Sequence, residues 1–157
     1  LKHNFQSFET SFRRSNLNYL VVKDNNYVRK LISILSKIKG WLKSDGVMYA
    51  SVPNARSLHR QIGVQLGMLD TIYDLNESDI RAGHRRVYDR QSLERDLKQA
   101  NFAIREIGGY NLKLVSLAQM QDWSDSLLDA IYEVSKRVPP DLCTNLWAVC
   151  SIKTQES

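Results

Sequence analysis

The residues best suited to chemistry gather in one short segment, residues 83–88 (GHRRVY). Its histidine, His84, is a candidate general base, because an imidazole changes its protonation state near neutral pH. Such a base would take a proton from a bound hydroxyl or ammonium group. The alternative is a structural role for His84, on the surface or as the anchor of a loop, since the sequence shows no partner that would orient the ring.

Four arginines could receive an anionic ligand. A guanidinium binds a carboxylate or a phosphate group through two parallel hydrogen bonds. The candidates are Arg56, Arg60, Arg85 and Arg86. The alternative is that these arginines form ion pairs with acidic residues of the same stretch. Those acidic residues are Asp70, Asp74, Glu77 and Asp79.

Three further side chains complete the candidate binding site. Asn54 follows an apolar run and a proline, so its amide can either bond a ligand or cap the helix that follows. Tyr27 and Tyr88 can form walls of a pocket, although tyrosines at such positions also pack in cores.

A strand, a helix and a second strand must position these residues. Apolar runs at residues 17–22 (LNYLVV) and 47–52 (VMYASV) predict buried strands. Between them, apolar residues recur every three or four positions over residues 28–42, which predicts an amphipathic helix ended by Ser44-Asp45-Gly46. Such a unit makes a parallel sheet, and ligands bind beyond the carboxyl ends of its strands.

The next stretch is a polar excursion over residues 54–90, an inserted helix near residues 55–69 and a loop expected to fold over the cleft. A helix over residues 91–99 follows, with Asp89 as its cap. Alternating apolar and polar residues then predict a half-buried strand over residues 102–107.

The last third of the chain is predicted to return to the sheet. Gly108-Gly109 predicts a turn after the preceding strand. Residues 116–137 have the spacing of a long amphipathic helix, closed by two prolines, and residues 145–152 predict a last strand. No linker divides the sequence, so we expect a single α/β domain over residues 1–157.

The composition excludes several classes of protein. A chain of 157 residues, 43% hydrophobic and 25% charged, is typical of one soluble globular domain. The net charge of +5 is too small to indicate nucleic acid as a partner. No run is apolar enough to predict a membrane span or a signal peptide, so we expect a cytoplasmic protein that does not bind membranes. Cys143 and Cys150 form no CxxC pair, which gives no support for a metal site or a disulfide framework.

Residues 42–63, LKSDGVMYASVPNARSLHRQIG, resemble a segment of class I S-adenosylmethionine-dependent methyltransferases that reads LKPGG, then an apolar strand, then VPN. Residues 51–114 as a series, with SVPN, GHRRVY and the Gly-Gly pair, resemble a bacterial branch of that superfamily. The resemblance implies a Rossmann-like half-sheet flanked by helices. Its strands correspond to the fourth to seventh of the family, in the spatial order 4-5-7-6, with the last strand antiparallel.

The resemblance also implies what the chain would bind. The complete enzyme would use S-adenosylmethionine as methyl donor, and this chain, its C-terminal half, would bind a small-molecule or saccharide-type acceptor. The donor motif of the family, E/D-x-G-x-G, is absent, because no G-x-G occurs among the seven glycines. A Leu-Glu-His run common after the fourth strand is replaced by Asn25-Asn26-Tyr27. We therefore expect this chain alone to be inactive.

Two other interpretations stay open. The first is a degenerate methyltransferase-like domain that serves as a non-catalytic interaction module. The second is an enzyme of another doubly wound family that binds a nucleotide or a sugar.

A fourth strand without its first-strand neighbour leaves a free edge, so we expect self-association, or pairing with a missing N-terminal half, along residues 17–22. The sequence begins with Leu1 rather than Met, which fits an excised piece.

Overall fold

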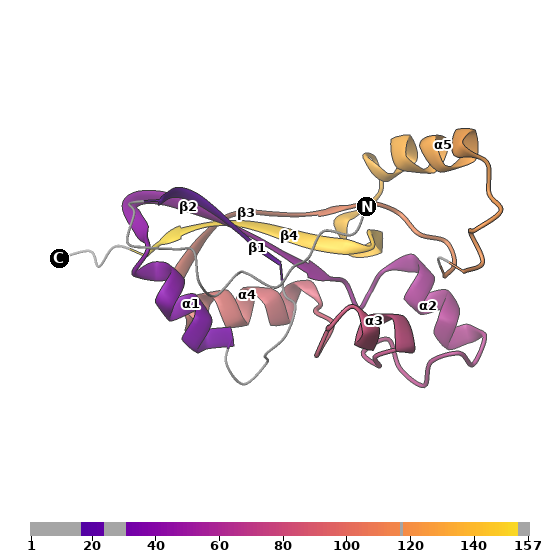
Figure 1. Cartoon of the computed structure of the whole chain (residues 1–157), viewed down its shortest axis with the longest axis horizontal. Coiled ribbons are helices and arrows are strands. Elements are labelled where there is room, and N and C mark those ends of the chain that lie inside the picture. The colour runs from indigo at the N-terminus through magenta and orange to yellow at the C-terminus, as the bar shows by residue number, and fades with distance from the viewer. Residues whose placement is uncertain (1–16, 24–30, 117, 154–157) are drawn as a thin grey trace.

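A four-stranded sheet forms the centre of the fold (Figure 1). The computed structural model describes residues 17–23, 31–116 and 118–153. Within them the sheet consists of β1 (Leu17–Lys23), β2 (Leu42–Pro53), β3 (Phe102–Tyr110) and β4 (Asn145–Ile152). The spatial order is β1-β2-β4-β3, with β1 parallel to β2 and β4 antiparallel to both of its neighbours. The predicted 4-5-7-6 order with an antiparallel last strand is therefore confirmed.

Two helices, α1 (Leu31–Lys39) and α4 (Arg90–Gln99), cover one face of this sheet (Figure 1). Side chains alternate along β2, so that every second residue points into the layer between sheet and helices. The core there includes Leu35, Ile38, Met48, Leu93, Leu97, Leu146 and Ala148. Asp89 accepts a hydrogen bond from the backbone of Ser92 at 2.7 Å, which confirms the predicted cap of α4.

The first helix ends earlier than the periodicity predicts. It stops at Lys39, and Gly40 and Trp41 turn the chain back through hydrogen bonds to the Lys37 and Ile38 carbonyls. Leu42 already belongs to β2 and is buried in the core, so Ser44-Asp45-Gly46 lies within the strand rather than after the helix. The expected stop signal was wrong because an apolar residue at a turn satisfies a helical pattern and a strand pattern equally well.

Residues 54–90 contain two short helices, α2 (Leu58–Gln65) and α3 (Glu77–Arg81). The first of them is the helix predicted near residues 55–69. The second is fixed by a reciprocal cap, in which Asn76 accepts a hydrogen bond from the Asp79 backbone and the Asp79 carboxylate accepts one from the Asn76 backbone. Both helices lie beyond the end of β2, beside the sheet rather than on its face (Figure 1).

The long helix expected over residues 116–137 is shorter in the structure. Helix α5 spans Asp125–Ser135, and the Ser124 side chain caps it by accepting from the Leu127 backbone. The amphipathic spacing would place Leu127 and Val134 on the buried side of the helix. Both are about half exposed, because α5 lies at one end of the sheet and not over its core (Figure 1). Among the described residues, no helix combines the length and the apolar character needed to cross a membrane.

Both cysteines are fully buried free thiols at the two ends of the central strand β4. Cys143 immediately precedes the strand and Cys150 lies near its end, next to Met48 of β2 and Ile104 of β3. Burial raises the pKa of the Cys150 thiol to about 12. The structure thus shows packed, protonated thiols and no disulfide between them.

Gly108 and Gly109 do not form the predicted turn but continue β3 alongside β4. A Cβ atom on Gly108 would lie 2.6 Å from the Trp147 ring. One on Gly109 would lie 2.6 Å from the Pro140 carbonyl oxygen and 2.7 Å from the Cys143 Cβ. The pair is glycine because neighbouring atoms approach the backbone closely, which a sequence pattern cannot distinguish from a need to turn.

We expect Gly109→Ala to lower the free energy of unfolding by about 1–3 kcal/mol, because the backbone that the new methyl group meets cannot rotate away. Gly63→Ala is the matched control: its Cβ would meet Leu69 at 3.5 Å, an ordinary contact, within helix α2. That control should be neutral or stabilising. Urea unfolding measures both variants, and equal stability would contradict the close packing at Gly109.

Candidate functional site

The end of β2 is joined to the GHRRVY segment. The Tyr88 amide donates to the Pro53 carbonyl at 2.9 Å, and the Ala55 amide donates to the Tyr88 carbonyl at 2.7 Å. Asn54 and Tyr88 thereby form a parallel bridge beyond the strand. The structure brings together two segments that the sequence singled out separately, at the carboxyl edge of the parallel strands.

Asn54 fastens this edge to the chain that enters β4. Its side chain is 1% exposed, and its amide nitrogen donates to the carbonyl oxygens of Cys143 at 2.7 Å and Asp141 at 2.9 Å. Its amide oxygen accepts from the Arg56 backbone at 2.9 Å. The side chain is therefore occupied by backbone groups in this conformation. It does not cap α2, whose first flanking residue is Ser57.

Arg60 is a buried anchor for the loop between α2 and α3. Its side chain is 3% exposed and donates to the Ile72 carbonyl at 2.9 Å, to the Asp74 carbonyl, and to the Asp79 carboxylate at 2.9 Å. A buried guanidinium is tolerated only when its donors are satisfied, and three acceptors do this here. The arrangement is the ion pair that the sequence offered as the alternative to ligand binding.

His84 lies directly after this anchored loop. Gly83 adopts a left-handed conformation with φ of 83°, and the His84 amide donates to the Asp79 carbonyl at 2.9 Å. The imidazole is half-buried. The residue is thus held by the same aspartate that binds Arg60, while Arg56 and Arg85 are exposed to solvent.

Tyr88 and Arg86 take up structural positions beside the core. The Tyr88 ring is fully buried, and the Arg86 guanidinium lies 4.1 Å from its centre. Arg86 also pairs with Asp96 of α4 at 2.9 Å. Tyr27, the remaining candidate, lies outside the described residues.

Two residues at this edge, His59 and Lys113, were not among the site residues predicted from the sequence. His59 follows Leu58 at the start of α2, and Lys113 follows β3; both side chains are half-buried. Burial is the main cause that lowers the pKa of each, and the pKa of His59 falls to about 4 with further contributions from the charges of Lys113 and Arg60. No motif marks either residue, because their proximity depends on how α2 and the segment after β3 sit at the sheet edge.

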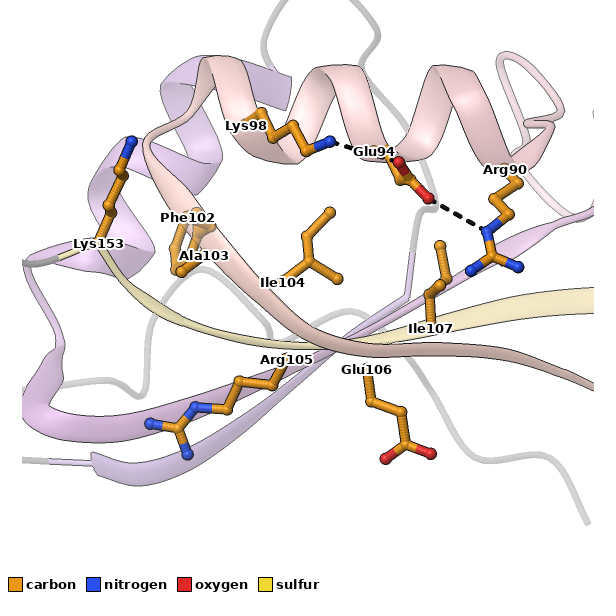
Figure 2. Close-up of a pocket in the computed structure, with 10 residues that line it drawn as sticks. All are labelled: Arg90, Glu94, Lys98, Phe102, Ala103, Ile104, Arg105, Glu106, Ile107 and Lys153. Carbon is orange, nitrogen blue, oxygen red and sulfur yellow. Dashed lines mark hydrogen bonds and ion pairs between the residues drawn. The ribbon is translucent and has the colours of Figure 1, made fainter.

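One cavity lies elsewhere, along β3 (Figure 2). Its volume is about 560 Å³, and it runs between α4 and the first half of the edge strand. Figure 2 shows Glu94 bridging Arg90 and Lys98 above Ile104 and Ile107. Because ligand sites of such sheets lie at the carboxyl ends of the parallel strands, this groove is not the candidate site.

A second, polar cavity of about 390 Å³ adjoins the GHRRVY segment, between Arg86 and the start of α4. The Tyr73 hydroxyl donates to Asp89 at 2.6 Å in its wall. In the part of the chain that the structure describes, no group of three or more His, Cys, Asp or Glu side chains is placed to hold a metal ion.

The comparison with protein families identifies the chain. Residues 26–107, about half of the sequence, match the family described as methyltransferase domain. The match includes α1, β2 and the GHRRVY segment, and it begins after the end of β1. The protein therefore belongs to the methyltransferase domain family, and the GHRRVY segment lies within the matched residues.

The chain is similar to solved structures, one of which, at a TM-score of 0.51, shows the same fold. An S-adenosylmethionine-dependent methyltransferase from Mesorhizobium loti matches 88% of this chain and 63% of its own, with a TM-score of 0.51 and 11% identity. One from Clostridium acetobutylicum ATCC 824 has a TM-score of 0.47 and 10% identity over 91% and 61% of the two chains. One from Archaeoglobus fulgidus has a TM-score of 0.44 and 14% identity over 87% of this chain and 59% of its own. The chain spans about three fifths of the length of these proteins, and no match was found among curated proteins.

The depressed pKa of His59 predicts a pH dependence of stability. Between about pH 6.5 and pH 4 the unfolded chain binds a proton that the folded chain does not, so the free energy of unfolding falls as the pH is lowered. His59→Gln should remove roughly 2 kcal/mol of this loss, since one pKa unit corresponds to about 1.4 kcal/mol and the ring is partly hydrated. Urea unfolding at several pH values measures it. The control His84→Gln should keep the His59 contribution, and parallel curves for wild type and His59→Gln would contradict the prediction.

Proposed function

We propose that this chain is the acceptor-binding part of an S-adenosylmethionine-dependent methyltransferase that acts on a small molecule or a saccharide-type acceptor. The observation that carries the proposal is the joining of the β2 end to the GHRRVY segment, in a chain whose family is that of methyltransferase domains. Strands β1, β2, β4 and β3 take the places of the fourth, fifth, seventh and sixth strands of the family sheet.

The donor itself does not fit the described residues alone. A donor site of this family needs two glycines separated by one residue at a strand end, where the backbone can approach the cofactor, and no two of the seven glycines have that spacing. The glycines with left-handed conformations, Gly67 and Gly83, lie beyond α2 and α3 and not at the end of β1. We therefore assign the donor site to a further segment that pairs with the edge of β1, which has a single neighbour among the described strands.

This chain would position the acceptor and remove its proton. Methyl transfer is an in-line displacement, so orientation supplies much of the rate enhancement. Arg60 and Asn54 hold the edge in shape from within, Tyr88 packs beneath it, and the exposed Arg56 and Arg85 are free to approach an acceptor. His84, held through its backbone by Asp79, is the proposed general base for an acceptor hydroxyl or ammonium.

The affinity for S-adenosylmethionine tests the division between two halves. We expect the 157-residue chain alone to bind no more tightly than millimolar, and the chain extended by the coding sequence before Leu1 to bind in the micromolar range. Isothermal titration calorimetry measures both. Micromolar binding by the short chain would overturn the division. An extended chain that binds no donor would instead identify a non-catalytic interaction module.

The role of His84 is tested in the extended enzyme. His84→Ala should lower kcat by about 10²–10⁴-fold, the usual contribution of a general base, with little change in stability. Arg81→Ala, an exposed position at the end of α3, is the matched control and should retain wild-type turnover. Near-native turnover of His84→Ala would show that the imidazole anchors its loop and does not take the proton.

A further inference from the structure

Thr144 and Asn145 hold the segments that leave β2 and β3 side by side. Pro53 and Tyr110, the last residues of these strands, both pair with Asn145 of β4. Beyond them, Thr144 accepts from the Asn54 amide at 3.0 Å and donates to the Asn111 carbonyl at 2.8 Å. Helix α2, which carries His59, and the segment with Lys113 therefore start from neighbouring points of the carboxyl edge.

The ion pair at this place satisfies its own members. The Asp79 carboxylate accepts from Arg60 at 2.9 Å and from the Asn76 backbone at 3.1 Å. The remaining Arg60 donors are used by the carbonyls of Ile72 and Asp74. The pair is neutral as a unit, so it offers no direct partner to a further charge.

The ammonium group of Lys113 lacks such a partner. Within the described residues it makes no hydrogen bond and no ion pair, although the side chain is half-buried. Its loss of water is the largest influence on its pKa, which is lowered; the Arg60 charge acts in the same direction and the Asp79 charge against it. A half-buried cation without a direct counter-ion is costly, and an anionic ligand would offset that cost.

His59 supplies a neutral donor close enough for the Lys113 charge to lower the pKa of its imidazole. Its Nδ1 atom is buried and has no hydrogen-bond partner in the described part of the chain, whereas Nε2 reaches solvent. A neutral imidazole carries one N–H group, and the lack of an acceptor at Nδ1 favours the proton on Nε2. With a pKa of about 4, the ring stays neutral at physiological pH.

We propose that His59 and Lys113 bind an oxyanion of the methyl acceptor, a carboxylate or a phosphate group, beside the Arg60–Asp79 pair. This inference rests on the proposed function, because it names the class of acceptor. The anion accepts hydrogen bonds from the Lys113 ammonium and from His59 Nε2–H, and it supplies the counter-ion that the cluster of His59, Arg60, Asp79 and Lys113 otherwise lacks. The acceptor is then an acidic small molecule rather than a neutral one.

The test is a histidine titration by NMR with inorganic phosphate or sodium formate, each compared with sodium chloride at equal ionic strength. A bound anion favours protonated imidazole, so phosphate, formate or both should raise the pKa of His59 by about 1–3 units. His59→Gln assigns the resonance among the three histidines. Lys113→Met should abolish the rise, whereas Lys98→Met, which removes an equal charge from the groove beside β3, should keep it.

A rise with phosphate only assigns a phosphate group, and one with formate only assigns a carboxylate. No rise with either anion, or an equal rise in Lys113→Met, overturns the proposal. Circular dichroism confirms the fold of each variant, and Lys113→Gln replaces Lys113→Met should the latter not fold. The result is independent of the calorimetry with S-adenosylmethionine. If the extended chain binds the donor and neither anion changes the pKa of His59, the anion site is excluded and the proposed function stands.

Discussion

A single buried guanidinium organises the functional end of this molecule. Arg60 leaves water almost completely, and its positive charge is tolerated because Ile72, Asp74 and Asp79 all turn oxygen atoms toward it. Leu66, Met68 and Tyr73 of the loop between α2 and α3 are exposed, so the polar contacts of Arg60, and not a hydrophobic core, hold this loop. The Asp79 carbonyl, which accepts from the His84 amide, also fixes the position of His84.

The Arg60–Asp79 ion pair also determines the electrostatics around it. Since Asp79 is committed to Arg60 and to the cap of α3, the nearest carboxylate cannot neutralise a second cation fully. Burial without full compensation lowers the pKa values of His59 and Lys113. Apolar or paired side chains at these two positions would stabilise the fold more. An uncompensated charge of this kind is typical of a ligand-binding site.

The sequence predicted the sheet well and its polar edge poorly. Strands such as residues 145–152 are continuous apolar runs, and the resemblance to a family ordered them correctly. Local signals with two meanings failed. Gly108-Gly109 is typical of a turn but here permits contact with Trp147 and Pro140, and the helical period over residues 116–137 conceals the start of α5 at Asp125. His59 and Lys113 follow two strand ends that backbone hydrogen bonds of Thr144 join, and no spacing along the chain encodes that arrangement.

The two buried thiols, Cys143 before β4 and Cys150 within it, allow opening of the sheet to be followed by chemical labelling. Cys143 and Cys150 are 1% and 0% exposed, and thiol reagents react with the thiolate, which burial suppresses at Cys150. Alkylation of Cys150 therefore requires β4 to separate from β2 and β3 first. The rate of labelling measures how often the sheet opens along its middle, and any ligand or second segment that closes the carboxyl edge will slow it.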